Sequence, residues 1–297
     1  MPSWQGKSRG NKLGYRIFVQ ILKSGGVLPA YFLLRFVTVY FYLFSYSSSK
    51  IIYEYFHRRL KFSRTKSLFE IYRNYYLLGQ TIIDRIVIMA GIPNRFSFDF
   101  DGEDQLRNMV SSGHGGLLIS AHIGNWEIAG HLLKRLNTPV NIVMFDGEHQ
   151  QIREYLEAIT GKMNAKIIVI KNDISHIYAI SEALKNNELV CIHGDRFVEG
   201  NKTISTNFLN APALFPIGPF VLASRFDVPV SFVFAMKESN LHYHFFASPI
   251  KYYRVADKQL GIQQVLGDFK AEMEKKIRKY PEQWYNYYNF WQEYDGN

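Results

Sequence analysis

An alternation of short apolar runs with helical segments is the feature of this sequence that most constrains its fold. The runs have the length and composition of strands, and they fall at 117–120, 140–145, 166–170, 189–193, 230–234 and 241–246. Segments with helical character separate the first four runs. Strands interleaved with helices form a sheet that is covered on both faces. We therefore predict an α/β fold whose single mixed, mostly parallel sheet is flanked by helices.

Two longer segments have clear helical periodicity. Apolar and aromatic residues keep helical spacing from 67 to 90, where Gly91 and Pro93 end the pattern, and again from 261 to 278. No internal repeat or convincing linker divides the chain. We expect a helical, membrane-associated N-terminal section over 1–95 and an α/β domain over 96–297, packed as one unit.

The N-terminal section contains an almost unbroken apolar stretch at 27–46. Five basic residues and no acid precede it in 1–25, and Arg35 lies near its middle, where a charge is costly in hydrocarbon. Three interpretations compete: a single membrane span, an interfacial or partly inserted helix, and a buried core helix. The basic connector at 50–66 is either a solvated face or a contact for anionic headgroups. With no cleavage site evident, we expect attachment to a membrane rather than secretion.

The charge balance restricts the classes of partner. Lys and Arg number 35 against 26 Asp and Glu, which gives a net charge of +9. An anionic lipid, an acidic carrier protein or a nucleic acid would fit that sign, but no nucleic-acid-binding motif accompanies it, so we expect no nucleic acid. Cys191 is the single cysteine, so the chain has no internal disulfide framework and a reducing, cytoplasmic location is expected.

A candidate catalytic pair lies where the first strand-like run ends. His122 follows the run on a glycine-containing turn, and Glu127 comes five positions later, where an amphipathic helix begins. An imidazole is a suitable general base for a hydroxyl, and a carboxylate on its other nitrogen fixes the tautomer. The spacing alone is weak, because His149 and Glu154 repeat it within a polar helix. His122 differs because strand ends in α/β sheets are where ligands bind.

Beyond this pair, the chain resembles the lysophospholipid acyltransferase superfamily, and within it the lipid A late acyltransferase branch. Four segments carry the resemblance in the order of the family: the H-x4-E block at 120–127, then 193–196, 211–220 with 228–230, and 280–284. The runs at 4–10 and 30–34 are similar to a bacterial subgroup associated with gene clusters for aryl polyene or flexirubin-type pigments. The resemblance covers nearly the whole chain.

The resemblance implies a membrane-associated acyltransferase with a glycerolipid acyltransferase-like fold. Such an enzyme moves an acyl chain from acyl carrier protein, or from acyl-CoA, to a hydroxyl or amine of a lipid-like acceptor. His122 would act as the general base and Glu127 would hold its imidazole. No cofactor is implied beyond the thioester co-substrate, and the spacing of ligands for a metal site is absent. The expected location is the cytoplasmic face of the bacterial inner membrane.

Candidate substrate contacts surround this pair in the sequence. The backbone amides of Gly124 and Asn125 are one possible source of oxyanion donors. Arg196 is placed to bind a phosphate or to pair with Asp195, and Arg153 is a second candidate cation. The remaining candidates are Phe215 and Gly218, the first and last residues of a Phe-Pro-Ile-Gly block. Glycerolipid acyltransferases have Phe-Pro-Glu-Gly here, so Ile217 stands where they have an acid. That change argues against transferring glycerol phosphate as the acceptor.

Two other functions remain open from the residues. The same base acting on water would give a thioesterase or lipase. A chain that kept the fold without turnover would be a basic protein that binds membranes or carrier proteins. The presence of both His122 and Glu127 favours an enzyme.

Overall fold

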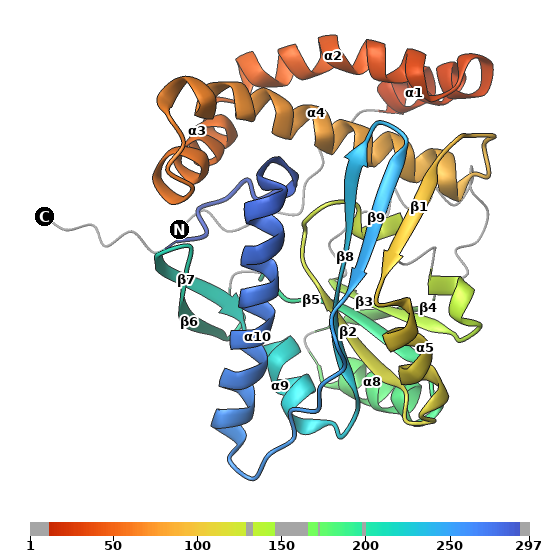
Figure 1. Ribbon diagram of the computed structural model, residues 1–297, viewed down its shortest axis with the longest axis vertical. Coiled ribbons are helices and arrows are strands. Elements are labelled where there is room, and N and C mark those ends of the chain that lie inside the picture. The colour runs from red at the N-terminus through yellow and green to blue at the C-terminus, as the bar shows by residue number, and fades with distance from the viewer. Residues whose placement is uncertain (1–11, 129–132, 146–165, 172, 198–199, 292–297) are drawn as a thin grey trace, which may run out of the picture.

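The N-terminal helices lie across one end of a central sheet (Figure 1). The computed structural model describes residues 12–128, 133–145, 166–171, 173–197 and 200–291. The N-terminal helices are α1 (Lys12–Gly25), α2 (Val27–Phe44), α3 (Tyr46–Glu54), the π-helix η1 (Tyr55–Arg59) and α4 (Arg64–Met89). The apolar stretch and the periodic segment expected at 67–90 are therefore helices. The basic connector folds as α3 and η1, and its last residues begin α4.

The sheet has seven strands in the order β1-β9-β8-β2-β5-β3-β4. Their bounds are β1 (Ser97–Asp101), β2 (Gly116–Ser120), β3 (Val140–Phe145), β4 (Lys166–Ile170), β5 (Leu189–His193), β8 (Val230–Ser239) and β9 (His242–Ala247). Strands β8, β2, β5, β3 and β4 are parallel, while β9 runs antiparallel to β8 and β1 is parallel to β9. The predicted mixed, mostly parallel α/β sheet is confirmed.

Helices and a hairpin complete the α/β part. The helices are α5 (Glu103–Ser111), η2 (Leu133–Leu136), α8 (Ser175–Lys185), α9 (Gly218–Arg225), α10 (Lys258–Lys279) and η3 (Pro281–Gln283). The separate hairpin pairs β6 (Thr203–Phe208) with β7 (Ala211–Pro216). Every residue of β2 is buried, because helices cover both faces of a sheet with a largely parallel centre. The six predicted strands are all present, and β1, β6 and β7 are additional.

Helix α2 has one face packed on α4 and the other open to solvent. Its buried residues are Val27, Ala30, Tyr31, Leu34 and Thr38, which share one side of the helix. Leu34 lies directly over Gly79 of α4, where even a Cβ atom would approach it to 2.4 Å. The opposite side of α2, which we call its apolar face, is formed by Leu28, Phe32, Phe36, Val39, Tyr40, Leu43 and Phe44. By length and composition alone, α2 is the one helix of the described residues that could cross a membrane.

Candidate active site

The register of two neighbouring strands brings His122 and Asp195 together. Strands β2 and β5 are parallel, and Ser120 at the end of β2 pairs with His193 at the end of β5. His122 and Asp195 each follow two residues later, at the carboxyl edge of the sheet. The amide of Gly194 donates to the carbonyl of Ser120 at 2.8 Å, which keeps the two chain segments side by side beyond the strands.

The carboxylate of Asp195 holds the imidazole and the backbone of His122. Nδ1 of His122 lies 2.8 Å from one carboxylate oxygen, and the amide of His122 donates to the other at 3.0 Å. Both side chains are buried. With Asp195 ionised, Nδ1 carries the proton and donates it, so Nε2 keeps a lone pair that can accept a proton.

The structure corrects the expected partner of this imidazole. Glu127 is not hydrogen-bonded to Nδ1; its carboxylate forms an ion pair with Arg85 of α4. The physical reason is that Nδ1 is already occupied by Asp195, while the turn after His122 directs Glu127 toward α4. The negative charge of Glu127 still favours the protonated imidazole, but less than that of Asp195 does.

The turn itself is fixed by backbone hydrogen bonds on both sides. Gly124 has a φ of 65°, and a Cβ atom there would approach the carbonyl oxygen of Ala235 to 2.1 Å, so only glycine fits. The amide of Gly124 donates to Gln283, and the amide of Asn125 donates to Ala235 at 2.7 Å. These two amides were expected to be oxyanion donors. They are already engaged, so their observed role is to hold the turn between β8 and the C-terminal tail.

Electrostatics keep His122 uncharged near neutral pH. Burial lowers its pKa most, and the positive charge of Arg196 lowers it further, against the opposing effect of Asp195. Burial alone would raise the pKa of Asp195, but His122 and Arg196 more than offset it and hold this pKa well below its usual range. Arg196 is anchored by donating to the carbonyl of Tyr285 at 2.5 Å. The site therefore pairs a neutral imidazole with an ionised carboxylate.

Two aromatic side chains that were not predicted for the site flank His122. The ring of Trp126 lies edge-on with its centroid 4.8 Å from that of His122, and the ring of His193 is 4.4 Å away. Burial and the neighbouring His122 lower the pKa of His193 to about 3, so this second imidazole is neutral. His122 and Asp195 each lie two residues after the end of their strand. This equal spacing could have indicated Asp195 as the partner of His122, but only once β2 and β5 were known to be neighbours.

The other predicted contacts lie elsewhere. Phe215 is fully buried in the aromatic core, with ring centroids 5.4 Å from Phe208 and 5.1 Å from Phe290. Gly218 begins α9 at the end of the same hairpin. No contact between either residue and His122 is present among the described residues. Arg153, like the His149 and Glu154 pair, lies outside the described residues.

Three side chains at this site are of types that can bind a metal ion. Within the described ranges, His122, His193 and Asp195 form the one group of such side chains, with ligand atoms within 4.8 Å of one another. The carboxylate of Asp195 already uses both oxygens to bond His122. This bonding orients the imidazole of His122, so the arrangement fits a hydrogen-bonded base.

An oriented, neutral histidine at the carboxyl edge of an α/β sheet is an arrangement typical of enzymes that use a general base. The sequence comparison is more specific. The model of the bacterial lipid A biosynthesis acyltransferase family matches residues 72–293, and the chain belongs to this family. Helix α2 precedes the matched segment.

Two curated relatives give a more distant comparison. Phosphatidylinositol mannoside acyltransferases from two strains of Mycobacterium tuberculosis, H37Rv and CDC 1551, are 26% and 25% identical to this chain over 126 residues. The match covers 41% of this chain and 39% of each relative. The chain therefore matches about two fifths of the length of these relatives.

Proposed function

We propose that this protein is a membrane-associated acyltransferase that moves an acyl chain from a thioester donor to a hydroxyl or amine of a lipid-like acceptor. The observation that carries the proposal is the pairing of His122 with Asp195, which leaves Nε2 able to accept a proton. Membership of the lipid A biosynthesis acyltransferase family supports the reaction class.

The chemistry follows from the orientation of the imidazole. Nε2 of His122 takes the proton of the acceptor hydroxyl as its oxygen forms a bond to the thioester carbonyl carbon. The tetrahedral intermediate then collapses, the carbon–sulfur bond breaks, and the imidazolium returns the proton to the leaving thiolate. Asp195 stabilises the imidazolium, and Arg196 supplies positive charge near the developing oxyanion. Glu127 acts through Arg85 to hold the turn that carries His122.

The donor class follows from charge, and the acceptor class from the relatives. A net charge of +9 suits an acidic acyl carrier protein, and it also suits the phosphates of a coenzyme A ester. The matched relatives are named for acylating a glycolipid, phosphatidylinositol mannoside. A lipid-like acceptor is therefore part of the proposal, and the chain needs no resident cofactor for it.

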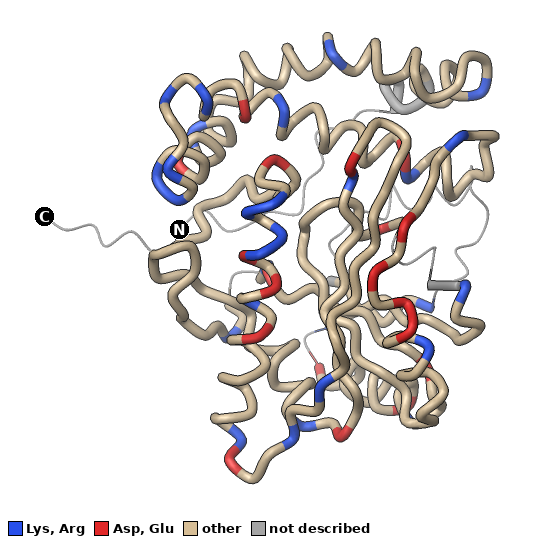
Figure 2. Tube along the Cα trace, in the orientation of Figure 1, with Lys and Arg blue, Asp and Glu red and all other residues tan. Residues whose placement is uncertain are grey.

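We place the protein on the cytoplasmic face of a bacterial inner membrane, with α2 lying in the interface. Its apolar face is exposed, while the opposite face is fixed against α4. Lys and Arg gather over α3, η1 and the start of α4, whereas α2 carries Arg35 alone (Figure 2). Spanning the bilayer would require α2 to leave α4, so the interfacial alternative is favoured over a single span.

One experiment tests both the reaction and the attachment. The purified protein is mixed with acyl carrier protein or coenzyme A thioesters and with anionic vesicles that contain a bacterial lipid extract. The vesicles are then sedimented, and lipids and free acids are measured by mass spectrometry. We expect the protein and a newly acylated lipid in the pellet. Free fatty acid without acylated lipid would instead identify a hydrolase, and protein left in the supernatant would contradict the membrane attachment.

The electrostatics of the site give a pH prediction. Because burial and Arg196 lower the pKa of His122, we expect the acid limb of kcat/KM to lie below the ordinary imidazole pKa of 6.5. Replacing Arg196 by Met removes a nearby positive charge. Without that charge the imidazolium of His122 is more stable, so the pKa of His122 rises. The acid limb should move to higher pH, with activity lost first at acidic pH.

Profiles from pH 5 to 9 for the wild type and Arg196→Met measure this shift. Arg254→Met is the matched control, since Arg254 is exposed and pairs with Asp227 on the surface. An acid limb that stays in place or moves to lower pH in Arg196→Met would refute the electrostatic role of Arg196.

A further inference from the structure

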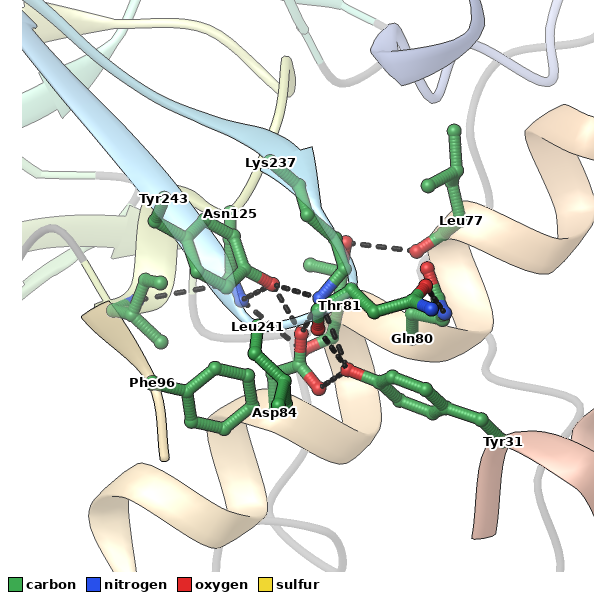
Figure 3. A network of polar contacts seen from close by, with 12 residues as sticks. Tyr31, Leu77, Gln80, Thr81, Asp84, Phe96, Asn125, Lys237, Leu241 and Tyr243 are labelled. Carbon is green, nitrogen blue, oxygen red and sulfur yellow. Dashed lines mark hydrogen bonds and ion pairs between the residues drawn. The ribbon is translucent and has the colours of Figure 1, made fainter. Parts of the chain in front are cut away.

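A buried polar cluster joins α2 to the strands beside the active site (Figure 3). Its four members are Tyr31 of α2, Asp84 of α4, Lys237 of β8 and Tyr243 of β9. All four side chains are buried, so none of them can exchange a partner for bulk water. We call these residues the α2 cluster.

The members of the α2 cluster satisfy one another. Nζ of Lys237 donates to Asp84 at 2.5 Å, to the hydroxyl of Tyr31 at 2.9 Å and to the carbonyl of Asn240 at 2.8 Å. The two oxygens of Asp84 accept separately, Oδ1 from Tyr31 and Oδ2 from Tyr243. A buried polar group without a hydrogen-bond partner costs free energy in the protein interior. The cluster therefore favours the one position of α2 against the sheet in which all four members are bonded.

The same cluster reaches the turn that carries His122. The side-chain amide of Asn125, three residues after His122, donates to the hydroxyl of Tyr243 at 3.2 Å. It also lies 3.2 Å from the carbonyl of Thr81, one turn before Asp84 on α4. Arg85, which follows Asp84, binds Glu127. Helix α4 and the cluster therefore hold the turn at Asn125 and at Glu127.

We propose that Tyr31 is a positioning residue for His122, and that the seating of α2 is transmitted to the catalytic turn through Asp84, Tyr243 and Asn125. This inference rests on the proposed function for its catalytic readout. Tyr31 lies outside the segment matched by the family model, so it adds to the site a contact that the matched segment does not contain. Phe32, its neighbour in the chain, belongs to the apolar face, so contact with lipid and contact with the cluster occur at adjacent positions of one rigid helix.

Tyr31→Phe tests the proposal because it removes the hydroxyl and keeps the ring. Lys237 and Asp84 retain each other, so the variant should fold. We expect kcat to fall about tenfold with KM for the donor unchanged, which is less than the roughly 10²-fold that a misplacement of about 1 Å can cost. Tyr76→Phe is the matched control, since it removes a hydroxyl at the same α2–α4 contact. That hydroxyl donates to the backbone carbonyl of Tyr31 and is not a member of the α2 cluster.

Amide hydrogen exchange measures how firmly the turn after His122 is held, and it needs no substrate. We expect faster exchange at Gly124 and Asn125 in Tyr31→Phe than in the wild type, and no change in Tyr76→Phe. Binding to anionic vesicles should slow this exchange in the wild type and slow it less in Tyr31→Phe. Unchanged exchange in Tyr31→Phe would overturn the proposal even if the enzyme is active. Faster exchange in Tyr31→Phe, combined with no acyl transfer by the wild type, would support the coupling and reject the proposed function.

A double-mutant cycle separates transmission from general loosening. Tyr243→Phe breaks the contact to Asn125 directly, so adding Tyr31→Phe to it should lower kcat little further. Additive losses of kcat in the double variant would show that Tyr31 acts by another route and would overturn the proposal.

Discussion

His122→Ala is expected to lower acyl transfer by about 10²- to 10⁴-fold, the contribution typical of a positioned general base. The side chain that accepts the proton is lost, while the backbone contacts of the turn to Ala235 and Gln283 do not depend on it. The variant should therefore fold and sediment with vesicles as the wild type does. Turnover is measured as acylated lipid per unit of protein, with His114→Ala, an exposed histidine ahead of β2, as the control.

The partner of His122 is tested in the same assay. Asp195→Asn keeps the shape of the side chain but offers an amide, which favours the tautomer with the proton on Nε2 and removes the base. We expect a loss close to that of His122→Ala. Glu127→Gln should lose much less, because Glu127 pairs with Arg85 rather than with the imidazole. A larger loss in Glu127→Gln than in Asp195→Asn would reverse these two roles, and a near wild-type rate in His122→Ala would exclude the mechanism.

Six of the seven strands of the central sheet were predictable because each contains a short apolar run that must be buried. Val140–Phe145, Lys166–Ile170 and Leu189–His193 have the bounds expected from the sequence. Strand β1 was missed because Ser97–Asp101 alternates acids with aromatics at the edge of the sheet, with only every second residue partly covered. Its pairing with β9 depends on a contact between distant parts of the chain.

The proposed catalytic pair, His122 and Asp195, could be predicted only in part from the sequence. His122 could be identified from the strand that precedes it, because that strand is encoded locally. Its partner could not, because β2 lies between β5 and β8, neither of which is next to it in the sequence. Glu127 was the nearest acid along the chain, whereas Asp195 is the nearest acid in space. The amides of Gly124 and Asn125 are likewise engaged by residues more than a hundred positions away.

The α2 cluster is the part least visible in the sequence. An aspartate within an amphipathic helix, such as Asp84, is usually exposed to solvent. A lysine near the end of a strand, such as Lys237, is usually exposed as well. Both are buried because each charge neutralises the other and two tyrosine hydroxyls occupy the remaining positions. Such an arrangement exists only after α2, α4 and β8 have come together, so no single segment encodes it.

Asp84→Ala is expected to lower the free energy of unfolding by about 3–5 kcal/mol, because it leaves the ammonium of Lys237 buried without its counter-charge. Burial already lowers the pKa of Lys237, and Asp84 is the charge that opposes this effect. Removing the carboxylate therefore favours loss of the proton or opening of the α2–α4 contact. Denaturant unfolding measures the change, with Asp227→Ala, which breaks an exposed pair with Arg254, as the control expected to change stability by less than about 1 kcal/mol.

Replacing both members of the buried pair distinguishes the cost of an unpaired charge from the value of the pair. The double variant Asp84→Leu with Lys237→Met has no buried charge, so it should recover most of the stability lost in Asp84→Ala. It also removes the acceptor of Tyr31 and Tyr243, so the position of the catalytic turn should remain perturbed and kcat should stay low. A double variant that recovers stability together with full activity would show that the cluster stabilises the fold without positioning His122.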